Sequence, residues 1–238
     1  ILASPAYNDA MEATPETAAA DLTLDEMRPL LAAALPAHVP FDGWTMRAVD
    51  AAAADLGIAP AAARLAAPGG DIDMIEAWLD AADAAMETAL NNDAFRAMKI
   101  RDKVTAAIRT RLEQAAPHKE AVRRAVAILA LPANAPRAAR RAWKTADAIW
   151  RAAGDTATDF NHYTKRALAA SIYTATLLTW LDDDSDDHQA TWAFLDRRID
   201  NVMQFEKLKA RVKSHFSADA GGPSLSRFLG RLRYPVEG

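Results

Sequence analysis

The sequence predicts an all-α protein. Residues that favour helices, chiefly Ala, Leu, Arg, Met and Glu, dominate the 238 positions, and no stretch alternates apolar and polar residues as a strand would. Gly and Pro gather at boundaries such as "GIAP", "APGG", "AAPH", "LPANAP" and "DDDSDD", which divide the chain into about ten helices. A hydrophobic content of 51% is ample for a buried core, and the absence of Cys excludes disulfides and thiolate metal sites.

The N-terminal part divides into a tail and three short helices. Residues 1–21 contain four acidic side chains and no Lys or Arg, so we expect a disordered acidic tail there. Residues 22–70 hold the three helices, the first of which we expect to run from Leu24 to Pro36 because "PAHVPFDG" follows. The second ends at Gly57, and a brief turn leads into the third, which is the geometry of a helix-turn-helix.

Longer helices follow over residues 71–217, which we expect to form a single helical body. Several of them carry one apolar stripe at helical spacing, such as Ile75, Leu79, Ala82 and Met86, or Trp192, Leu195, Ile199 and Val202. Such stripes usually form the core, so we do not interpret their Trp and Met residues as a cofactor site.

Residues 218–238 form the last segment, a flexible link and a short amphipathic helix. Apolar and basic residues alternate at helical spacing there: Leu225, Arg227, Phe228, Leu229, Arg231 and Leu232. A Leu and Phe face with a basic rim fits an anionic membrane surface, although docking on the protein's own body is an equal alternative. No apolar run approaches the roughly 20 residues needed to span a bilayer.

Charge is distributed unevenly along the chain. Residues 1–95 carry 3 basic and 16 acidic side chains, whereas residues 96–144 carry 13 basic and 3 acidic ones. The two regions must therefore face different partners or each other.

The three N-terminal helices resemble the DNA-binding module of TetR-type regulators, in the run "FDGWT", the segment from Ala51 to Gly57 and "PGG" before a long helix. DNA binding draws most of its affinity from Lys and Arg on phosphates. Residues 41–90 carry 2 basic side chains, Arg47 and Arg64, against 9 acidic ones. We therefore expect a degenerate helix-turn-helix that does not bind nucleic acid, with the function in the helical body.

No pattern of catalytic or metal-binding residues stands out. The five His residues lack helical metal spacing, and no Ser sits in a nucleophile elbow. The run "DDDSDDH" lacks the central Gly and the final Glu of a calcium loop, so we interpret it as a solvated link with Ser185 or an Asp as helix cap. We expect no catalytic residues, no metal and no cofactor.

The stretch "TDFNHYTKR" gathers six polar or aromatic side chains: Asp159, Asn161, His162, Tyr163, Lys165 and Arg166. Asp159 and His162 are three residues apart, so a carboxylate that orients an imidazole is one interpretation. The other is a helix start capped by Asp155, Thr158 or Asp159, with polar first turns facing water.

Three long segments resemble the ubiquinone biosynthesis accessory family, Coq-nine: "RRAVAILALPANAP", "ADAIWRAAGDTATDFNHYTKRALAASIYTATLLTWLDDDS" and "TWAFLDRRIDNVM". The similarity covers about residues 24–213 and is most specific over 118–203. It implies a homodimeric TetR-like fold without DNA binding, which holds an isoprenoid quinone or a phospholipid in its helical body. It also implies attachment to a membrane surface through the C-terminal helix.

The resemblance further implies that the protein is not itself a catalyst. It would present quinone intermediates to the di-iron demethoxyubiquinone hydroxylase of the Coq-seven type. We expect a cytoplasmic protein that is peripheral on the inner membrane, on the mitochondrial matrix face if the source is eukaryotic. The alternative is a TetR-type ligand-responsive transcription regulator.

Site residues follow from the resemblance and the apolar stripes. The partner-binding positions are the six of "TDFNHYTKR", where mitochondrial members of the family have Trp in place of His162. An imidazole buries less apolar area than an indole, which weakens the expected contribution of that position. Candidate lipid-lining residues on stripes of the middle helices are Trp78, Leu79, Val104, Ile108, Val126, Leu129, Trp150 and Ile172.

Overall fold

The computed structural model describes residues 22–67, 69–155 and 160–218, with side chains throughout except at 160, 161, 203 and 205–218. The chain divides into two compact units, residues 1–195 and 196–238. All regular elements within the described ranges are helices, which confirms the predicted all-α class.

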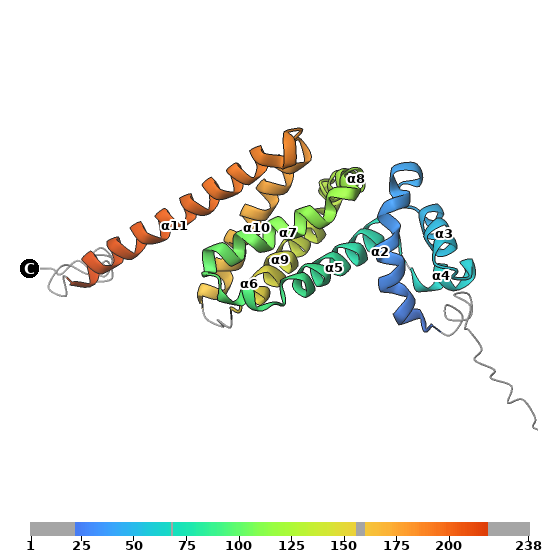
Figure 1. Ribbon diagram of the computed structural model, residues 1–238, viewed down its shortest axis with the longest axis horizontal. Helices are drawn as coiled ribbons and strands as arrows, with labels where there is room; N and C mark the ends of the chain where they lie inside the picture. Colours follow the sequence, from blue (N-terminus) through green and yellow to red (C-terminus); the bar gives the residue numbers. More distant parts are fainter. Residues whose placement is uncertain (1–21, 68, 156–159, 219–238) are drawn as a thin grey trace, which may run out of the picture. The chain divides into compact units, whose positions relative to one another are not determined.

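The first three described helices are α2 (Leu24–Asp42), α3 (Met46–Asp55) and α4 (Pro60–Ala66), and they pack against one another (Figure 1). A capping box starts α2: the Thr23 side chain accepts from the backbone N–H of Glu26, whose carboxylate accepts from the backbone N–H of Thr23. The predicted cluster of three short helices is therefore present, although α2 is longer than expected.

The predicted end of the first helix at Pro36 is wrong, because α2 continues through Pro36 and Pro40 to Asp42. Each proline removes one helical hydrogen bond. Two tertiary interactions favour the continued helix. Pro36 and Val39 are buried, and Arg124 donates to the carbonyls of Val39 and Pro40 at 3.0 and 2.9 Å. The guanidinium thus binds carbonyls in the last turn, and the carbonyl of Val39 also accepts from the backbone N–H of Gly43 at 2.9 Å.

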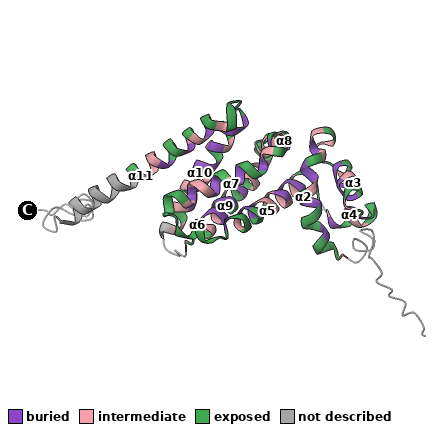
Figure 2. Ribbon diagram, viewed as in Figure 1, coloured by how far each residue is buried: buried purple, intermediate pink, exposed green. Residues whose placement is uncertain are grey.

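The body is built from five longer helices and a short one: α5 (Asp71–Leu90), α6 (Asp93–Ala97), α7 (Ile100–Ala115), α8 (Lys119–Leu129), α9 (Ala135–Ala152) and α10 (Phe160–Leu181). Helices α5, α7 and α9 pack against one another, and α10 packs on α7 and α9 (Figure 1). Helix α8 contacts α2, α5 and α9. Buried residues run along the facing sides of these helices (Figure 2).

Two tryptophans join the N-terminal helices to the body. The rings of Trp44 and Trp78 lie with centroids 5.4 Å apart, and both are buried. The Trp44 indole N–H donates to the carbonyl of Ala121 at 3.3 Å. Because the pair buries large apolar surfaces and satisfies a polar atom, it holds α2–α4 against α5 and α8.

Helices α5 and α9 face each other through opposite charges, which accounts for part of the uneven charge along the sequence. Acidic residues of α5 pair with basic residues of α9 in the same order: Asp73 and Glu76 with Arg137, Asp80 and Asp83 with Arg141, Asp80 with Lys144, and Glu87 with Arg151. We call this set the α5–α9 ion ladder. Hydrogen bonds from Arg137 hold the pKa values of Asp73 and Glu76 below their usual range. The ladder sets the register of the two helices.

The acidic run before α11 (Gln189–Ala218) is built around one buried carboxylate. Asp183 accepts from the N–H and hydroxyl of Ser185 at 2.9 and 2.6 Å, and from the N–H and hydroxyl of Thr191 at 2.8 and 2.5 Å. These bonds hold the pKa of Asp183 far below its usual range. The run was expected to be solvated, but Asp183 turns inward because four donors replace its water. No cluster of acids or His within the described residues could hold a metal ion.

Replacing Asp183 by Asn should lower the free energy of unfolding at pH 7 by about 2 kcal/mol, because an amide nitrogen faces donors where a carboxylate oxygen accepted. Because the pKa of Asp183 is depressed in the folded state, the wild type exceeds the variant in free energy of unfolding by the full amount above the ordinary Asp pKa of about 3.9. Below that pH the difference becomes progressively smaller. Urea unfolding of both proteins at pH 7 and at pH 3.5 measures this decrease in the stability difference. The exposed neighbour provides the control: Asp184→Asn should change stability by less than about 0.5 kcal/mol. A gap that stays the same at both pH values would contradict the role of the charge.

Candidate functional site

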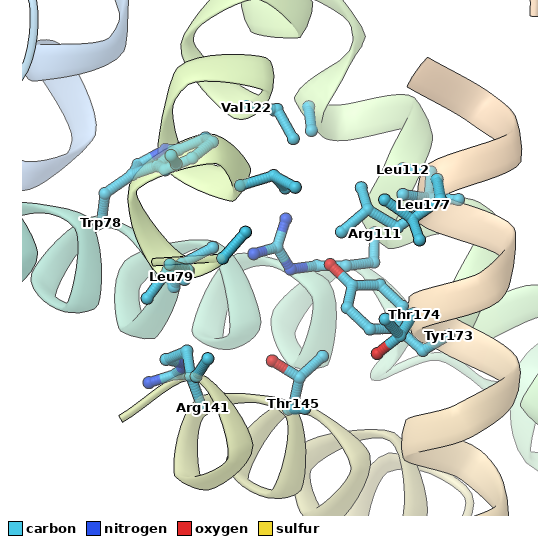
Figure 3. Close-up of a pocket in the computed structure, with 18 of the residues that line it drawn as sticks. Trp78, Leu79, Arg111, Leu112, Val122, Arg141, Thr145, Tyr173, Thr174 and Leu177 are labelled. Carbon is cyan, nitrogen blue, oxygen red and sulfur yellow. The ribbon is translucent and has the colours of Figure 1, made fainter. Parts of the chain in front are cut away.

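A cavity of about 420 Å³ lies among α5, α7, α8, α9 and α10 (Figure 3). Most of its lining is apolar, with Leu112, Val122 and Leu177 among the larger side chains and several alanines from α8 and α9. Alanine leaves space where two helices approach, so the Ala-rich stretches of the sequence create this volume. A mostly apolar cavity with a few polar groups is the usual form of a small-molecule site.

Four of the eight predicted lipid-lining residues, Trp78, Leu79, Val126 and Leu129, line this cavity. The other four, Val104, Ile108, Trp150 and Ile172, lie elsewhere in the body, and three of these are buried. Helices such as α7 are covered on more than one side, so an apolar stripe cannot show which of its residues face a cavity. That the lining binds a lipid stays a prediction.

Sequence reasoning missed the buried polar residues of the cavity, Arg111, Arg141, Thr145 and Tyr173. All four are buried, with 2% and 4% exposure for the two arginines. One feature of the sequence could have indicated them: Arg111 is a cation between the apolar residues Ile108 and Leu112, on the face that the helix buries. Charged side chains are almost never fully buried without a partner.

The partner is Asp83 of α5. The Nε of Arg111 donates to Asp83 Oδ1 at 3.0 Å, and Arg141 donates to Asp83 Oδ2. The Thr145 hydroxyl also donates to Asp83, at 3.0 Å. Two buried guanidinium groups therefore share one buried carboxylate, while the second carboxylate on Arg141, Asp80, is about half exposed.

Two nitrogen atoms in this group have no hydrogen-bond partner within the described part of the chain: Nη2 of Arg111 and Nε of Arg141. An unsatisfied buried donor usually costs about 1–3 kcal/mol. Burial raises the pKa of the nearby Tyr173 phenol. The carboxylate of Asp83 also raises this pKa, whereas the positive charges of Arg111 and Arg141 oppose the increase. Tyr173 is therefore neutral near pH 7 and keeps its hydroxyl proton as a donor.

The predicted docking residues divide into buried and exposed ones. Arg166 is 3% exposed, and its Nε donates to Asp147 at 2.5 Å while Nη1 lies 3.3 Å from Asp155. Lys165 also pairs with Asp155, at 2.7 Å. Burial opposes the charge of Asp155, but Lys165 and Arg166 hold its pKa below the usual range. Arg166 was expected at the exposed surface; it instead ties α10 to α9, because two carboxylates are available there.

Tyr163 is the exposed member, at 61%. Its ring lies beside those of His162 and Trp143, with centroid distances of 5.2 and 6.1 Å. The three rings form what we call the aromatic platform, on α9 and α10. Of the remaining predicted positions, Asp159 and the side chain of Asn161 lie outside the described residues.

The predicted membrane-binding residues, Leu225, Arg227, Phe228, Leu229, Arg231 and Leu232, all lie outside the described residues. Among the helices that are described, none combines the length and the apolar character that a membrane span requires. The membrane-binding segment stays a prediction.

The N-terminal helices place their basic residues in ion pairs. Arg64 of α4 donates to Asp50 through Nε and Nη2 at 2.8 and 2.6 Å. Arg47 lies 3.8 Å from Asp42. Both basic side chains of residues 41–90 are thus neutralised locally, which leaves α4 with little attraction for phosphate.

Comparison of structures gives the fold. The crystal structure of a TetR transcriptional regulator from Nitrosomonas europaea matches with a TM-score of 0.58 and 21% identity, over 74% of this chain and 97% of that one. The match shows a TetR-like fold, as predicted, and nothing about DNA binding.

Comparison of sequences gives the family. Residues 135–206 match the COQ9 family model. The mitochondrial ubiquinone biosynthesis protein COQ9 of Rattus norvegicus is 35% identical over 192 residues, which are 78% of this chain and 61% of that protein. The human protein of the same name is 33% identical and the Drosophila melanogaster protein 30%, with 60% and 62% of their lengths covered. The chain thus spans about three fifths of these relatives, and its sequence matches the COQ9 family.

Proposed function

We propose that this chain is a non-catalytic accessory protein of ubiquinone biosynthesis, which binds an isoprenoid quinone intermediate and presents it to the di-iron demethoxyubiquinone hydroxylase. The observation that carries the proposal is the apolar cavity of about 420 Å³ within the helical body. The names of the relatives, which are ubiquinone biosynthesis proteins, support the pathway.

The physical reason for such a carrier is the cost of moving an isoprenoid through water. Each exposed CH₂ group costs about 0.8 kcal/mol, so a polyprenyl chain leaves a bilayer only where another apolar environment receives it. Leu177 and Leu178 of α10, together with Val126 and Leu129 of α8, supply that environment in the cavity. Leu178 is 48% exposed, so the apolar lining continues to the protein surface.

Lipid binding can be measured by mass spectrometry of organic extracts of the purified chain. We expect an isoprenoid or phospholipid to be present in the wild type. Ala142→Phe, which places a ring among the lining residues, should lower the lipid-to-protein ratio by about twofold or more, because a benzene-sized cavity occupies roughly 150 Å³. Ala127→Phe is the matched control, since Ala127 is exposed on α8 and does not line the cavity. An extract of the wild type without lipid would contradict the proposal.

We further propose that the aromatic platform of Trp143, His162 and Tyr163 is the surface that docks the hydroxylase. Exposed aromatic residues are enriched among the residues that dominate protein interfaces. Arg166 would support the platform from beneath, since its ion pairs hold α10 on α9.

Tyr163→Ala should weaken binding of the purified hydroxylase by about 2 kcal/mol, or roughly thirtyfold, because truncation removes the most exposed ring of the platform. Biolayer interferometry measures the affinity, and circular dichroism checks that the helices persist. Phe41→Ala is the control: it truncates another exposed aromatic residue, 88% exposed on α2. Equal affinities for the wild type and Tyr163→Ala would show that docking occurs elsewhere. Arg166→Ala is unsuitable as a probe, because it would remove the buried ion pairs that hold α10 on α9 and so change the packing as well as the surface.

Because the fold is TetR-like, the alternative function is a transcription regulator. Measuring the binding of a DNA duplex distinguishes the two functions. Because Arg47 and Arg64 are paired with carboxylates and acidic residues surround them, we expect no binding of a labelled duplex up to about 10 µM protein at low salt. Fluorescence anisotropy measures this directly. Micromolar binding that weakens steeply with added salt would instead favour the regulator.

A further inference from the structure

The cavity is chemically uneven. Arg111, Arg141, Thr145 and Tyr173 contribute its buried polar side chains, Thr174 adds an exposed hydroxyl, and the remaining lining is almost entirely apolar. In Figure 3 the Arg111 guanidinium extends among the lining side chains, with the Tyr173 ring drawn beside it. An apolar ligand alone would not require these groups.

Hydrogen bonding within the polar group is incomplete. Nη2 of Arg111 and Nε of Arg141 are buried and lack a partner among the residues that the structure describes. Arg111 is 98% buried, since its exposure is 2%, and it lines the cavity. Buried polar groups are nearly always satisfied, so an unpaired guanidinium N–H beside an open volume indicates a missing acceptor.

The balance of charge also indicates a missing acceptor. Two buried guanidinium groups face one buried carboxylate, Asp83, and the additional partner of Arg141, Asp80, is half exposed. The neutral Tyr173 hydroxyl adds a donor and no charge. This side of the cavity therefore attracts an oxygen with negative or partly negative charge.

Size limits how much of a ligand enters. A cavity of roughly 150 Å³ accepts benzene, whereas this one measures about 420 Å³. It has room for an aromatic ring and the first part of a tail, and not for a whole polyprenyl chain. The remaining tail would leave over the rim, where Thr174 and Leu178 are exposed.

We propose that Arg111, with Tyr173, binds an acceptor oxygen on the ring of the lipid, so that the ligand enters head first and its tail points outward. This inference rests on the proposed lipid-binding function and specifies the end of the lipid that the cavity recognises. The opposite orientation would place hydrocarbon against the unpaired guanidinium N–H groups and leave them unsatisfied. A fatty-acid carboxylate offers the same acceptor chemistry, so the test separates it from a ring oxygen.

Three probes distinguish these possibilities: a ubiquinone with two isoprene units, myristate, and farnesene, which is a prenyl hydrocarbon without oxygen. Quinone binding is measured by quenching of tryptophan fluorescence, since Trp78 lines the cavity. The two colourless probes are measured by competition with the quinone. The protein is the full chain.

Arg111→Met is the main variant. It removes one of two cations from Asp83 and leaves the Arg141 pair in place, so the fold should persist. We expect quinone affinity to fall about tenfold or more, as for a lost hydrogen bond to a charged group, and farnesene affinity to stay within about twofold. Tyr173→Phe keeps the ion cluster intact and should weaken quinone binding by severalfold, which preserves the test if Arg111→Met does not fold. Thr88→Val is the matched control, because it removes an exposed hydroxyl of α5 at a residue that does not line the cavity.

A selective loss of quinone affinity supports the head-first orientation. Equal losses for quinone and farnesene, or no loss for either, would overturn it, because the arginine would then serve only the fold. A loss confined to myristate would also overturn it in favour of a carboxylate site. If the wild type bound none of the three probes, the proposed function itself would fail, and this outcome is distinct from wild-type binding that the variants do not change.

Discussion

The structure of the body depends on one interaction, the opposition of acidic residues on α5 to basic residues on α9. Most rungs of the α5–α9 ion ladder are partly exposed, and exposed pairs contribute little stability individually. The rung at Asp83 differs, since Asp83, Arg111 and Arg141 are buried and join α5, α7 and α9 at one point. Moving Asp83 out of this position would leave two buried cations without their shared carboxylate, so the three helices are held in a single register.

The cavity follows from that register. The ladder spaces α5 and α9 by long charged side chains, while alanines such as Ala138 and Ala142 leave the volume between them unfilled. The same arginines that align the helices also line the cavity, and each carries a buried N–H group without a partner among the described residues. In the proposed binding mode, Arg111 combines a structural role with a binding role, which would account for two cations around one buried carboxylate.

At the α9–α10 junction, neighbouring residues differ in role: some hold the two helices together, and one is exposed to solvent. Arg166 and Lys165 hold the junction through Asp147 and Asp155, whereas Tyr163 is directed to solvent beside Trp143. All of these residues except Trp143 and Asp147 lie in or beside one polar stretch of sequence, which predicted a single exposed surface. A helix of 3.6 residues per turn places adjacent residues on different faces, and only the partner helix determines which face is covered.

The sequence by itself determined the all-α class, most helix boundaries, the TetR-like arrangement and the match to the COQ9 family, because these depend on local propensity and on motifs that are continuous along the chain. It could not determine the length of α2, where tertiary contacts offset the prolines, or which apolar residues line the cavity, because stripes on multiply covered helices are equivalent in sequence. The burial of Arg111, Arg141, Arg166 and Asp183 was also decided only by the tertiary structure. The three arginines are stable inside because they meet carboxylates from other parts of the chain, which no local pattern records. Asp183 is held by donors close in sequence, Ser185 and Thr191, but only the turn of the chain brings all four of them to one carboxylate.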